Sequence, residues 1–479
     1  MSPRQLQARD LLIRLERRPG ARVGRQLEEQ LRGAIRSGAI GGGIELPSTR
    51  ALAEDLGVSR GVVVRAYSQL AGEGYIHLRQ GANPRVRGLA PVETLRPAGR
   101  DHSSGPKVRY DLRAHLPELG AFPRQAWLRS VRDSLGRASN SDLAYLDPQG
   151  LPALRRELAS YLGRARGVVP DPRQIVVTAG ATHALHLIAS VLARRGSTRM
   201  AFENPSHAAL HSVAELAGQT PVGVPVDSDG IVVDRIRDVG AVVASPAHQF
   251  PMGVAMSADR RAQLIDWSRR TSGLVIEDDY DAEFRYDRPP IGALQGLGPE
   301  HVAYIGSTGK TLAPAMRIGW AVLPPGLVEP VAEELAGSLL HISGIDQLAF
   351  ADFLRRGEFD RHLRRMRVLY RSRRDAVVEG LLFHLPKLRV RGIAAGLHVV
   401  VELPSAALEA EVRAQARTAG VLVESISQHA LPGYDGPPGI LLGYGSVAEP
   451  TLPAALAQLA AAIEAVLCPA DHAKRAASA

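Results

Sequence analysis

Apolar side chains recur at helical spacing three times between residues 20 and 75. The first pattern repeats every four residues and so gives one apolar face of a helix that ends at the next glycine. Ser48 precedes the second pattern and Ser59 the third, each at a candidate N-cap. Two short helices separated by a short turn with a glycine predict a helix-turn-helix. The apolar positions of the first pattern are Leu27, Leu31 and Ile35.

The third helical pattern, "SRGVVVRAYSQLAGEG", places Val62, Ala66 and Leu70 on its inner face. The segment that follows, "YIHLRQGANPRVRG", reads as two short strands around a turn. Together these elements predict a winged helix-turn-helix, an α+β domain over residues 1–88.

From residue 110 onward, strand-like apolar runs alternate with helical patterns. This alternation predicts βαβ units, which means a mostly parallel sheet with helices on both faces. Residues 89–109 lack periodicity and are rich in Pro, Gly, Ser and charge, so we expect a flexible linker there. We expect a disordered tail over 471–479. The strand-like runs are "QIVVTAG", "RMAFENP", "AVVASPA", "GLVIEDDY", "HVAYIGST" and "IGWAVLP".

Composition narrows the class of protein. With 479 residues and 45% apolar composition, the chain is globular and long enough for about three units of ~100–200 residues. We find neither a signal-peptide core nor an apolar run near the ~20 residues of a membrane span, so we expect a cytoplasmic protein without membrane contact. The single cysteine, Cys468, excludes internal disulfides and zinc sites built on cysteine pairs.

Positive charge is concentrated near the N-terminus. The formal net charge is +9, and residues 1–88 contribute +7 of it, with 15 Arg against 8 Asp or Glu. Such asymmetry favours a polyanionic partner for this domain. On the predicted helices and wing, the arginines that would face outward are Arg50, Arg60, Arg65, Arg79, Arg85 and Arg87. Arginines so placed contact phosphates or guanine edges in DNA, although a solvated basic face is the plain alternative.

Lys310 is one of only four lysines, against 54 arginines. It lies in a Gly/Ser/Thr turn between two apolar runs, "YIGSTGKTLAPAMRIGW". An amine whose pKa is lowered by desolvation can attack a carbonyl and form a Schiff base, which a guanidinium cannot do. Lys310 is therefore a candidate nucleophile, with a surface lysine as the alternative.

Other polar groups follow the ends of neighbouring predicted strands. Ligands in open α/β sheets bind beyond the carboxyl ends of the strands. The turn Gly180–Ala181–Thr182 offers backbone N–H groups at a helix start, which suits a phosphate. An acidic strand end adds Asp278 and Tyr280, and the lysine segment adds Ser307 and Arg317. An amine, a carboxylate, a hydroxyl and an anion cradle are what a phosphorylated pyridine aldehyde requires.

A nucleotide-binding site and a metal site are the alternatives for these segments. A nucleotide-binding P-loop at "GSTGKT" needs a glycine six residues before the lysine, where Tyr304 stands, so its spacing fails. A metal site at the acidic cluster lacks a neighbouring pair of histidines at ligand spacing.

The segment "ELPSTRALAEDLGVSRGVVVRAYSQLAGEGYI" closely resembles the DNA-binding domain of GntR-type bacterial transcription regulators. The resemblance implies binding to a double-stranded DNA operator. Val62 stands where that family often has a threonine, and Asn83 where it usually has a second glycine. The implied DNA-binding residues are Arg50, Ser59, Arg60, Gly61, Arg65 and Arg79.

The segments "VTAGATHAL", "SPAHQFPMG", "EDDYDAEFRYD" and "YIGSTGKTLAPAMRIGW" resemble the fold-type I, aspartate-aminotransferase-like domain of MocR-type regulators. The resemblance covers residues 110–470 and implies an α/β domain that binds pyridoxal 5'-phosphate, with a small C-terminal α+β subdomain from about 326 to 470. It implies an internal aldimine at Lys310, Asp278 on the pyridinium nitrogen and Tyr280 on the phenolic oxygen. The implied phosphate ligands are Ser307, Arg317 and the Gly180, Ala181, Thr182 turn.

Three more residues enter through the same resemblance. His207 stands where the family has a ring-stacking tyrosine, His248 lies in "SPAHQFPMG", and Tyr145 resembles the tyrosine that reaches the partner subunit's phosphate in a homodimer. Family members that sense amino acids hold a carboxylate with arginines, but "SHAALH" and "GILLGYGS" contain none. Pyridoxal phosphate itself, or an amine of another shape, is therefore the expected effector.

Three functions follow from these patterns. The favoured one is a transcription regulator whose aminotransferase-like domain senses pyridoxal phosphate or an amine. The second is an active aminotransferase with an appended DNA-binding domain. The third is a DNA-binding protein whose large domain serves only for dimerisation.

Overall fold

The structure is a computed structural model that describes residues 11, 13–16, 18, 22–87, 108–114, 116–338 and 342–468. Contacts divide the chain into two compact units, Met1–Gly105 and Pro106–Ala479. The expected linker lies outside the described residues except for Val108 and Arg109, and the expected tail lies wholly outside them.

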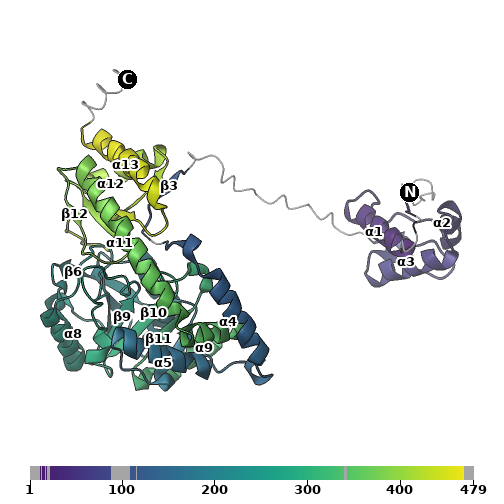
Figure 1. Cartoon of the computed structure of the whole chain (residues 1–479). Coiled ribbons are helices and arrows are strands. Elements are labelled where there is room, and N and C mark those ends of the chain that lie inside the picture. The colour runs from purple at the N-terminus through teal and green to yellow at the C-terminus, as the bar shows by residue number, and fades with distance from the viewer. Residues whose placement is uncertain are drawn as a thin grey trace, which may run out of the picture. The chain divides into compact units, whose positions relative to one another are not determined.

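The first unit has three helices followed by a two-stranded antiparallel sheet, drawn in purple in Figure 1. Its elements are α1 (Val23–Arg36), α2 (Thr49–Asp55), α3 (Arg60–Gly72), β1 (Ile76–His77) and β2 (Arg85–Val86). Ser48 caps α2, because its hydroxyl accepts a hydrogen bond from Ala51 N–H. Ser59 occupies the N-cap position of α3 without a side-chain cap bond. The predicted winged helix-turn-helix is confirmed.

The core of this unit shows one error in the predicted helix faces. Leu27, Leu31 and Ile35 are buried as expected. On α3, however, Val63 is the buried valine, and Val62 is only partly buried. Tyr67 completes the inner face, which therefore starts one residue later than the pattern suggested.

An eight-stranded sheet forms the centre of the second unit (Figure 1). The strand β11 is antiparallel to both of its neighbours and β7 is antiparallel to β6, while the other neighbours are parallel. The mostly parallel sheet is thus confirmed; β6 and β7 were not predicted. In order across the sheet, the strands are β4 (Ile175–Thr178), β11 (Gly319–Val322), β10 (Val302–Ser307), β9 (Leu274–Asp279), β8 (Ala241–Ala244), β5 (Arg199–Asn204), β6 (Thr220–Asp227) and β7 (Gly230–Ile231).

Helices cover both faces of this sheet, as predicted. Because side chains alternate along a strand, Val176 of β4 packs into one apolar cluster while Ile175 and Val177 pack into another. The Val176 side is covered by α6 (Ala181–Arg194), α7 (Ala208–Leu216) and α9 (Pro325–Ser338). The opposite side is covered by α5 (Pro152–Arg166), α8 (Ala258–Thr271) and α10 (Gly344–Arg355), with α4 (Arg124–Arg137) packed on α10.

A smaller antiparallel sheet follows in the chain, in the order β12 (Val390–Arg391), β13 (His398–Glu402), β16 (Gly439–Gly443) and β15 (Glu424–Ser425). The helices of this subdomain are α11 (Glu358–His384), α12 (Ala407–Thr418) and α13 (Leu452–Leu467). The strand β14 (Val421–Leu422) pairs with β3 (Tyr110–Asp111), so the start of the second unit is joined to this subdomain.

Two helices expected in the small subdomain pack elsewhere. α9 lies against α6, and α10 lies against α4 and α5. Their apolar faces therefore belong with the large sheet, and the subdomain begins at α11 rather than near residue 326. Sequence alone gave no signal for this division, because α9 and α10 carry the same helical period as the helices that follow.

Among the described residues, one helical segment, Glu449–Leu467, is long and apolar enough to cross a membrane by length and composition alone. The expectation that no apolar run comes near the length of a membrane span is wrong for this helix. Within the fold, Leu456, Leu459 and Ile463 of α13 are buried in the main apolar cluster, and α13 packs on α11 and α12.

Candidate cofactor and DNA sites

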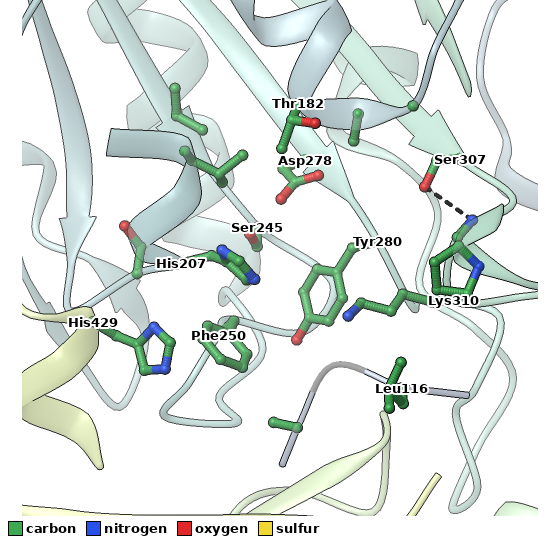
Figure 2. Close-up of a pocket in the computed structure, with 18 of the residues that line it drawn as sticks. Leu116, Thr182, His207, Ser245, Phe250, Asp278, Tyr280, Ser307, Lys310 and His429 are labelled. Carbon is green, nitrogen blue, oxygen red and sulfur yellow. Dashed lines mark hydrogen bonds between the residues drawn. The ribbon is translucent and has the colours of Figure 1, made fainter. Parts of the chain in front are cut away.

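A cavity of about 400 Å³ lies beyond the carboxyl ends of β5, β8, β9 and β10, beside the start of α6 (Figure 2). The fold brings to it residues that are far apart in the chain, from Ala114 to His429. Nine of the residues predicted from sequence line it: Gly180, Ala181, Thr182, His207, Asp278, Tyr280, Ser307, Lys310 and Arg317.

One wall of the cavity suits an anion. Gly180 is the N-cap of α6 and has a φ of 98°, so the first N–H groups of this helix face the cavity from a turn that favours glycine. The guanidinium of Arg317 lies beside this turn, since a Cβ on Gly180 would be 3.9 Å from its Nη1. Ser307, on the same wall, accepts a hydrogen bond from Gly309 N–H at 3.4 Å.

Asp278 lies on β9, and one of its carboxylate oxygens is available to a ligand. Its Oδ1 is buried and accepts no hydrogen bond from the part of the chain that the structure describes. Burial, with the neighbouring carboxylates of Asp279 and Asp281, raises the pKa of Asp278 to about 7. A cationic N–H donor placed against Oδ1 would satisfy this atom and favour the carboxylate.

Lys310 lies on the same cavity, in the turn after β10. Burial lowers the pKa of its amine to about 8, against a partial opposing effect of nearby carboxylates. Asp281 is the largest of these opposing charges, and Glu424 comes next. An amine with this pKa is neutral in a substantial fraction of molecules near pH 7 to 8, which is the form that attacks a carbonyl.

Tyr280 and His248 form a hydrogen-bonded pair at the cavity wall. The Tyr280 hydroxyl lies 3.0 Å from His248 Nδ1, which also lies 3.0 Å from Asp281 Oδ2. In Figure 2 the ring of Tyr280 lies between Phe250 and the Lys310 amine. His248 itself is buried behind Tyr280 and does not line the cavity. Its hydrogen bond orients the tyrosine, whereas the expected direct contact of His248 with a cofactor stays a prediction.

Tyr145 is not at the cavity either. Its side chain is fully exposed, at 107% of the reference area, and is absent from the cavity wall. Within a single chain it reaches no described site residue, so its expected role depends on a partner subunit.

Several cavity residues were not foreseen. Glu203 ends β5 and Ser245 follows β8, so the rule of strand ends could have found both. Burial raises the pKa of Glu203 to about 8. The other polar or aromatic side chains among them are Ser206, Phe250, Glu424 and His429. The last two come from the small subdomain, and no spacing in the sequence links them to Lys310.

The first unit presents its predicted DNA-binding residues to solvent. All six, Arg50, Ser59, Arg60, Gly61, Arg65 and Arg79, are exposed. Arg60 donates a hydrogen bond to Thr49 Oγ1 at 3.4 Å, which links the starts of α2 and α3. Arg85 of the wing instead pairs with Glu45 at 3.6 Å. Accessible positive charge thus lies on both helices of the turn and, through Arg79 and Arg87, on the wing segment as well.

Comparison with protein families identifies both units. Residues 24–86 match the family described as bacterial regulatory proteins, gntR family. Residues 118–435 match aminotransferase class I and II. The chain belongs to the MocR-type transcription regulators of the GntR family.

Two relatives align with the chain over almost their whole length. The chain is 34% identical over 462 residues to the HTH-type pyridoxine biosynthesis transcriptional regulator PdxR of Corynebacterium glutamicum, covering 95% of this chain and 99% of that protein. It is 32% identical to the probable rhizopine catabolism regulatory protein MocR of Rhizobium meliloti, with 92% and 94% covered.

Solved structures similar to the second unit of this MocR-type chain are aminotransferases. The chain superposes on an archaeal alanine:glyoxylate aminotransferase with a TM-score of 0.68 and 27% identity, covering 74% of this chain and 90% of that one. The kynurenine aminotransferase of Pyrococcus horikoshii gives the same TM-score at 24% identity, with 75% of this chain and 91% of that one covered. At this identity the similarity supports the fold alone. The predicted fold-type I domain is confirmed.

Proposed function

We propose that this MocR-type protein binds pyridoxal 5'-phosphate at Lys310 and that occupancy of the site changes how its N-terminal domain binds an operator. The observation that carries the proposal is the meeting, in one cavity, of the Lys310 amine, the Asp278 carboxylate and the start of α6. The name of the Corynebacterium relative, a regulator of pyridoxine biosynthesis, supports the same ligand.

The residues present fit this cofactor. The buried Asp278 Oδ1, which accepts nothing from the described residues, suits the N–H of a protonated pyridine ring. The start of α6 together with Arg317 and Ser307 suits a phosphate dianion. When bound, the cofactor supplies an aldehyde carbon that an amine can attack.

The remaining side chains would orient and shield the ring. Tyr280, held by His248, presents its hydroxyl to the side of the cavity that holds Lys310. His207 lies on the wall beside Phe250, with ring centroids 5.4 Å apart, where an imidazole can stack on a planar ligand. Leu116 and Phe250 keep that side of the cavity apolar.

We further propose that the aminotransferase-like unit is a sensor with little or no residual transamination. The opposing candidate, a working aminotransferase, is favoured by the named activities of the solved neighbours. Against it, the cavity wall formed by described residues holds no arginine besides Arg317, so an amino acid carboxylate lacks its usual partner.

The proposal implies a homodimer that acts on double-stranded DNA in the cytoplasm, associated with the nucleoid. Two leucines seven residues apart on α4, Leu128 and Leu135, are about half exposed, and Leu143 and Tyr145 are exposed nearby in sequence. Apolar side chains so placed support burial against a second copy. The two N-terminal domains of the dimer would then bind paired half-sites on the DNA.

One experiment separates the candidates. A footprint of the full chain on the DNA upstream of its own gene is recorded without ligand, with pyridoxal phosphate and with pyridoxine 5'-phosphate, which lacks the aldehyde. We expect only pyridoxal phosphate to change the footprint, together with a borohydride-trapped adduct at Lys310. A ligand acts on DNA binding only through different affinities for two arrangements, and a tenfold effect corresponds to about 1.4 kcal/mol.

The opposing results are distinct. Sustained turnover of amino donors with a keto acid would establish the aminotransferase instead. An absent adduct with an unchanged footprint would favour the large unit as a dimerisation scaffold.

A further inference from the structure

The small sheet carries a row of three side chains across one face. Leu441 of β16 pairs in register with Val400 of β13 on one side and with Glu424 of β15 on the other. Residues opposite each other in antiparallel strands project to the same face. Val400 and Leu441 are buried in an apolar cluster with Ala114 and Phe250, and the row ends in the Glu424 carboxylate.

Glu424 lies on the ligand cavity close to Lys310. It lines the cavity, and its Oε2 accepts a hydrogen bond from Ala114 N–H at 2.9 Å, which holds the side chain at the wall. Lys310 lines the same cavity, so the Glu424 carboxylate and the Lys310 amine border one ligand space. The negative charge of Glu424 raises the pKa of that amine, against the larger effect of burial.

The charges around this end of the cavity favour a cation. Of the described side chains that line it, Lys310 and Arg317 are the cationic ones, and both are engaged by the cofactor under the proposed function. Arg113, the cation next to Ala114, pairs with Asp111 at 2.6 Å. A ligand carboxylate would therefore meet Glu424 without a compensating arginine, whereas a ligand ammonium would gain a charge-assisted hydrogen bond.

Part of the cavity wall is apolar. Leu116 lies near Lys310 in Figure 2, and Phe250 lies on the other side of the Tyr280 ring from the amine. Such a surface suits methylene groups, which do not form hydrogen bonds.

We propose that the amine effector of this protein is a short aliphatic diamine, with one nitrogen directed to the cofactor aldehyde carbon and the other held as an ammonium by Glu424. This inference rests on the proposed binding of pyridoxal phosphate at Lys310. In the exchange, the carbon–nitrogen double bond to Lys310 breaks and one to the ligand nitrogen forms. The two hydrogens of the incoming amine end on the Lys310 nitrogen, so no further reactant is needed.

The test uses the cofactor-loaded full chain and three ligands with the same four-carbon chain: 1,4-diaminobutane, n-butylamine and 4-aminobutanoate. Half-saturating concentrations are read from the change in cofactor absorbance at one pH. We expect 1,4-diaminobutane to half-saturate at a concentration at least tenfold below that of n-butylamine, and 4-aminobutanoate to bind most weakly.

The Glu424→Gln variant keeps the acceptor for Ala114 N–H but removes the charge. We expect it to abolish most of the diamine preference, measured as the ratio of the two half-saturating concentrations. That ratio, compared between proteins, cancels the different basicities of the two amines. Glu411→Gln is the matched control, because Glu411 is exposed on α12 and does not line the cavity.

The outcomes distinguish the diamine inference from the proposed binding of pyridoxal phosphate, on which it rests. If wild-type protein shows no cofactor absorbance and no trapped adduct, the proposed function itself fails. If the adduct forms but wild-type protein does not prefer the diamine, the diamine inference is overturned and the cofactor site stands. An equal preference in the wild-type and Glu424→Gln proteins also overturns the assignment to Glu424.

Discussion

Gly319, the first residue of β11, packs against Gly180 so closely that a Cβ on Gly319 would lie 2.6 Å from the Gly180 Cα. Real Cβ atoms do not approach backbone this closely, so the turn that starts α6 requires a residue without a side chain at the start of β11, the strand that pairs with β4. The geometry of the anion-binding wall is therefore fixed partly by β11.

Replacing Gly319 with alanine should displace the Gly180 turn and weaken binding of the phosphorylated cofactor. We expect the Kd for pyridoxal phosphate to rise about tenfold, which corresponds to roughly 1.4 kcal/mol, in a fluorescence titration. Gly326→Ala serves as the control, since a Cβ there meets nothing within 4 Å. Equal affinity in both variants would show that the turn tolerates the shift.

The pKa of Lys310, lowered to about 8 by burial, predicts a pH profile for cofactor capture. Only the neutral amine attacks, so the rate of adduct formation should rise with pH and level off above about 8, well below the ordinary lysine pKa of roughly 10.4. Stopped-flow absorbance measures this. Lys310→Ala should form no adduct while remaining folded and retaining much of its basal DNA affinity; Lys387→Ala, at an exposed lysine, should behave as wild type. A midpoint near 10 would contradict the buried amine.

Periodicity and strand ends were enough to predict from sequence several of the polar residues that line the candidate cofactor cavity. The residues on β9, β10 and the start of α6 follow apolar runs directly, and parallel strands bring such ends to one edge. For His248, a segment match identifies the neighbourhood but does not say which side chain faces the cavity. In the structure His248 hydrogen-bonds to Asp281 and to the Tyr280 hydroxyl, and Tyr280 is the one that lines the cavity.

The small subdomain contributed what the sequence could not predict. Glu424 lies on a two-residue strand, β15, which is too short to show a period. Its approach to Lys310 depends on the pairing of β15 with β16 and on the hydrogen bond to Ala114, a residue 310 positions earlier. Long-range pairings of this kind leave no local signature.

Asp278→Asn should stabilise the cofactor-free protein in a pH-dependent way. The pKa of Asp278, raised to about 7, lies above its ordinary value, so the wild type loses stability as pH rises through 7 and the carboxyl ionises. The variant avoids this loss. We expect its free energy of unfolding, measured by thermal unfolding, to match that of wild type at pH 4 and to exceed it at pH 8. The difference at pH 8 should be on the order of 2 kcal/mol, about half of what 1.36 kcal/mol per pKa unit would give, because Asp278 is partly exposed.

The same Asn variant should bind pyridoxal phosphate more weakly, since the carboxylate is lost. Asp266→Asn, at an exposed residue of α8, is the control for both measurements. A variant less stable than wild type at pH 8 would refute the raised pKa.

The buried ion pair between Arg166 and Asp279 should be costly to break. Their side chains are each 1% exposed, with Arg166 Nε donating to Asp279 Oδ2 at 2.8 Å, and the Tyr304 hydroxyl donates to the same oxygen. Asp279→Leu leaves a buried guanidinium unpaired, so we expect a loss of about 3–5 kcal/mol in the unfolding transition of the large unit. Arg166→Met combined with Asp279→Leu should recover part of this loss. A double variant as unstable as the single one would show that the charge of Arg166 is not the cause.

Arg60→Ala should weaken binding to DNA from the region upstream of the protein's own gene. Arg60 is the first residue of α3, exposed and steadied by Thr49, where it can reach a base edge or a phosphate. Loss of a base contact costs ~1–3 kcal/mol and relaxes sequence preference at one position, whereas loss of a phosphate contact lowers the salt slope by about 1 for every sequence. Gel-shift titrations at several salt concentrations, on specific and scrambled DNA, distinguish these results. Arg25→Ala removes the same charge from α1, where Arg25 pairs with Glu29 at 2.9 Å, and should leave binding nearly unchanged. If both variants weaken binding equally, the basic surface acts only through its overall charge, and the assignment of Arg60 to the DNA interface is wrong.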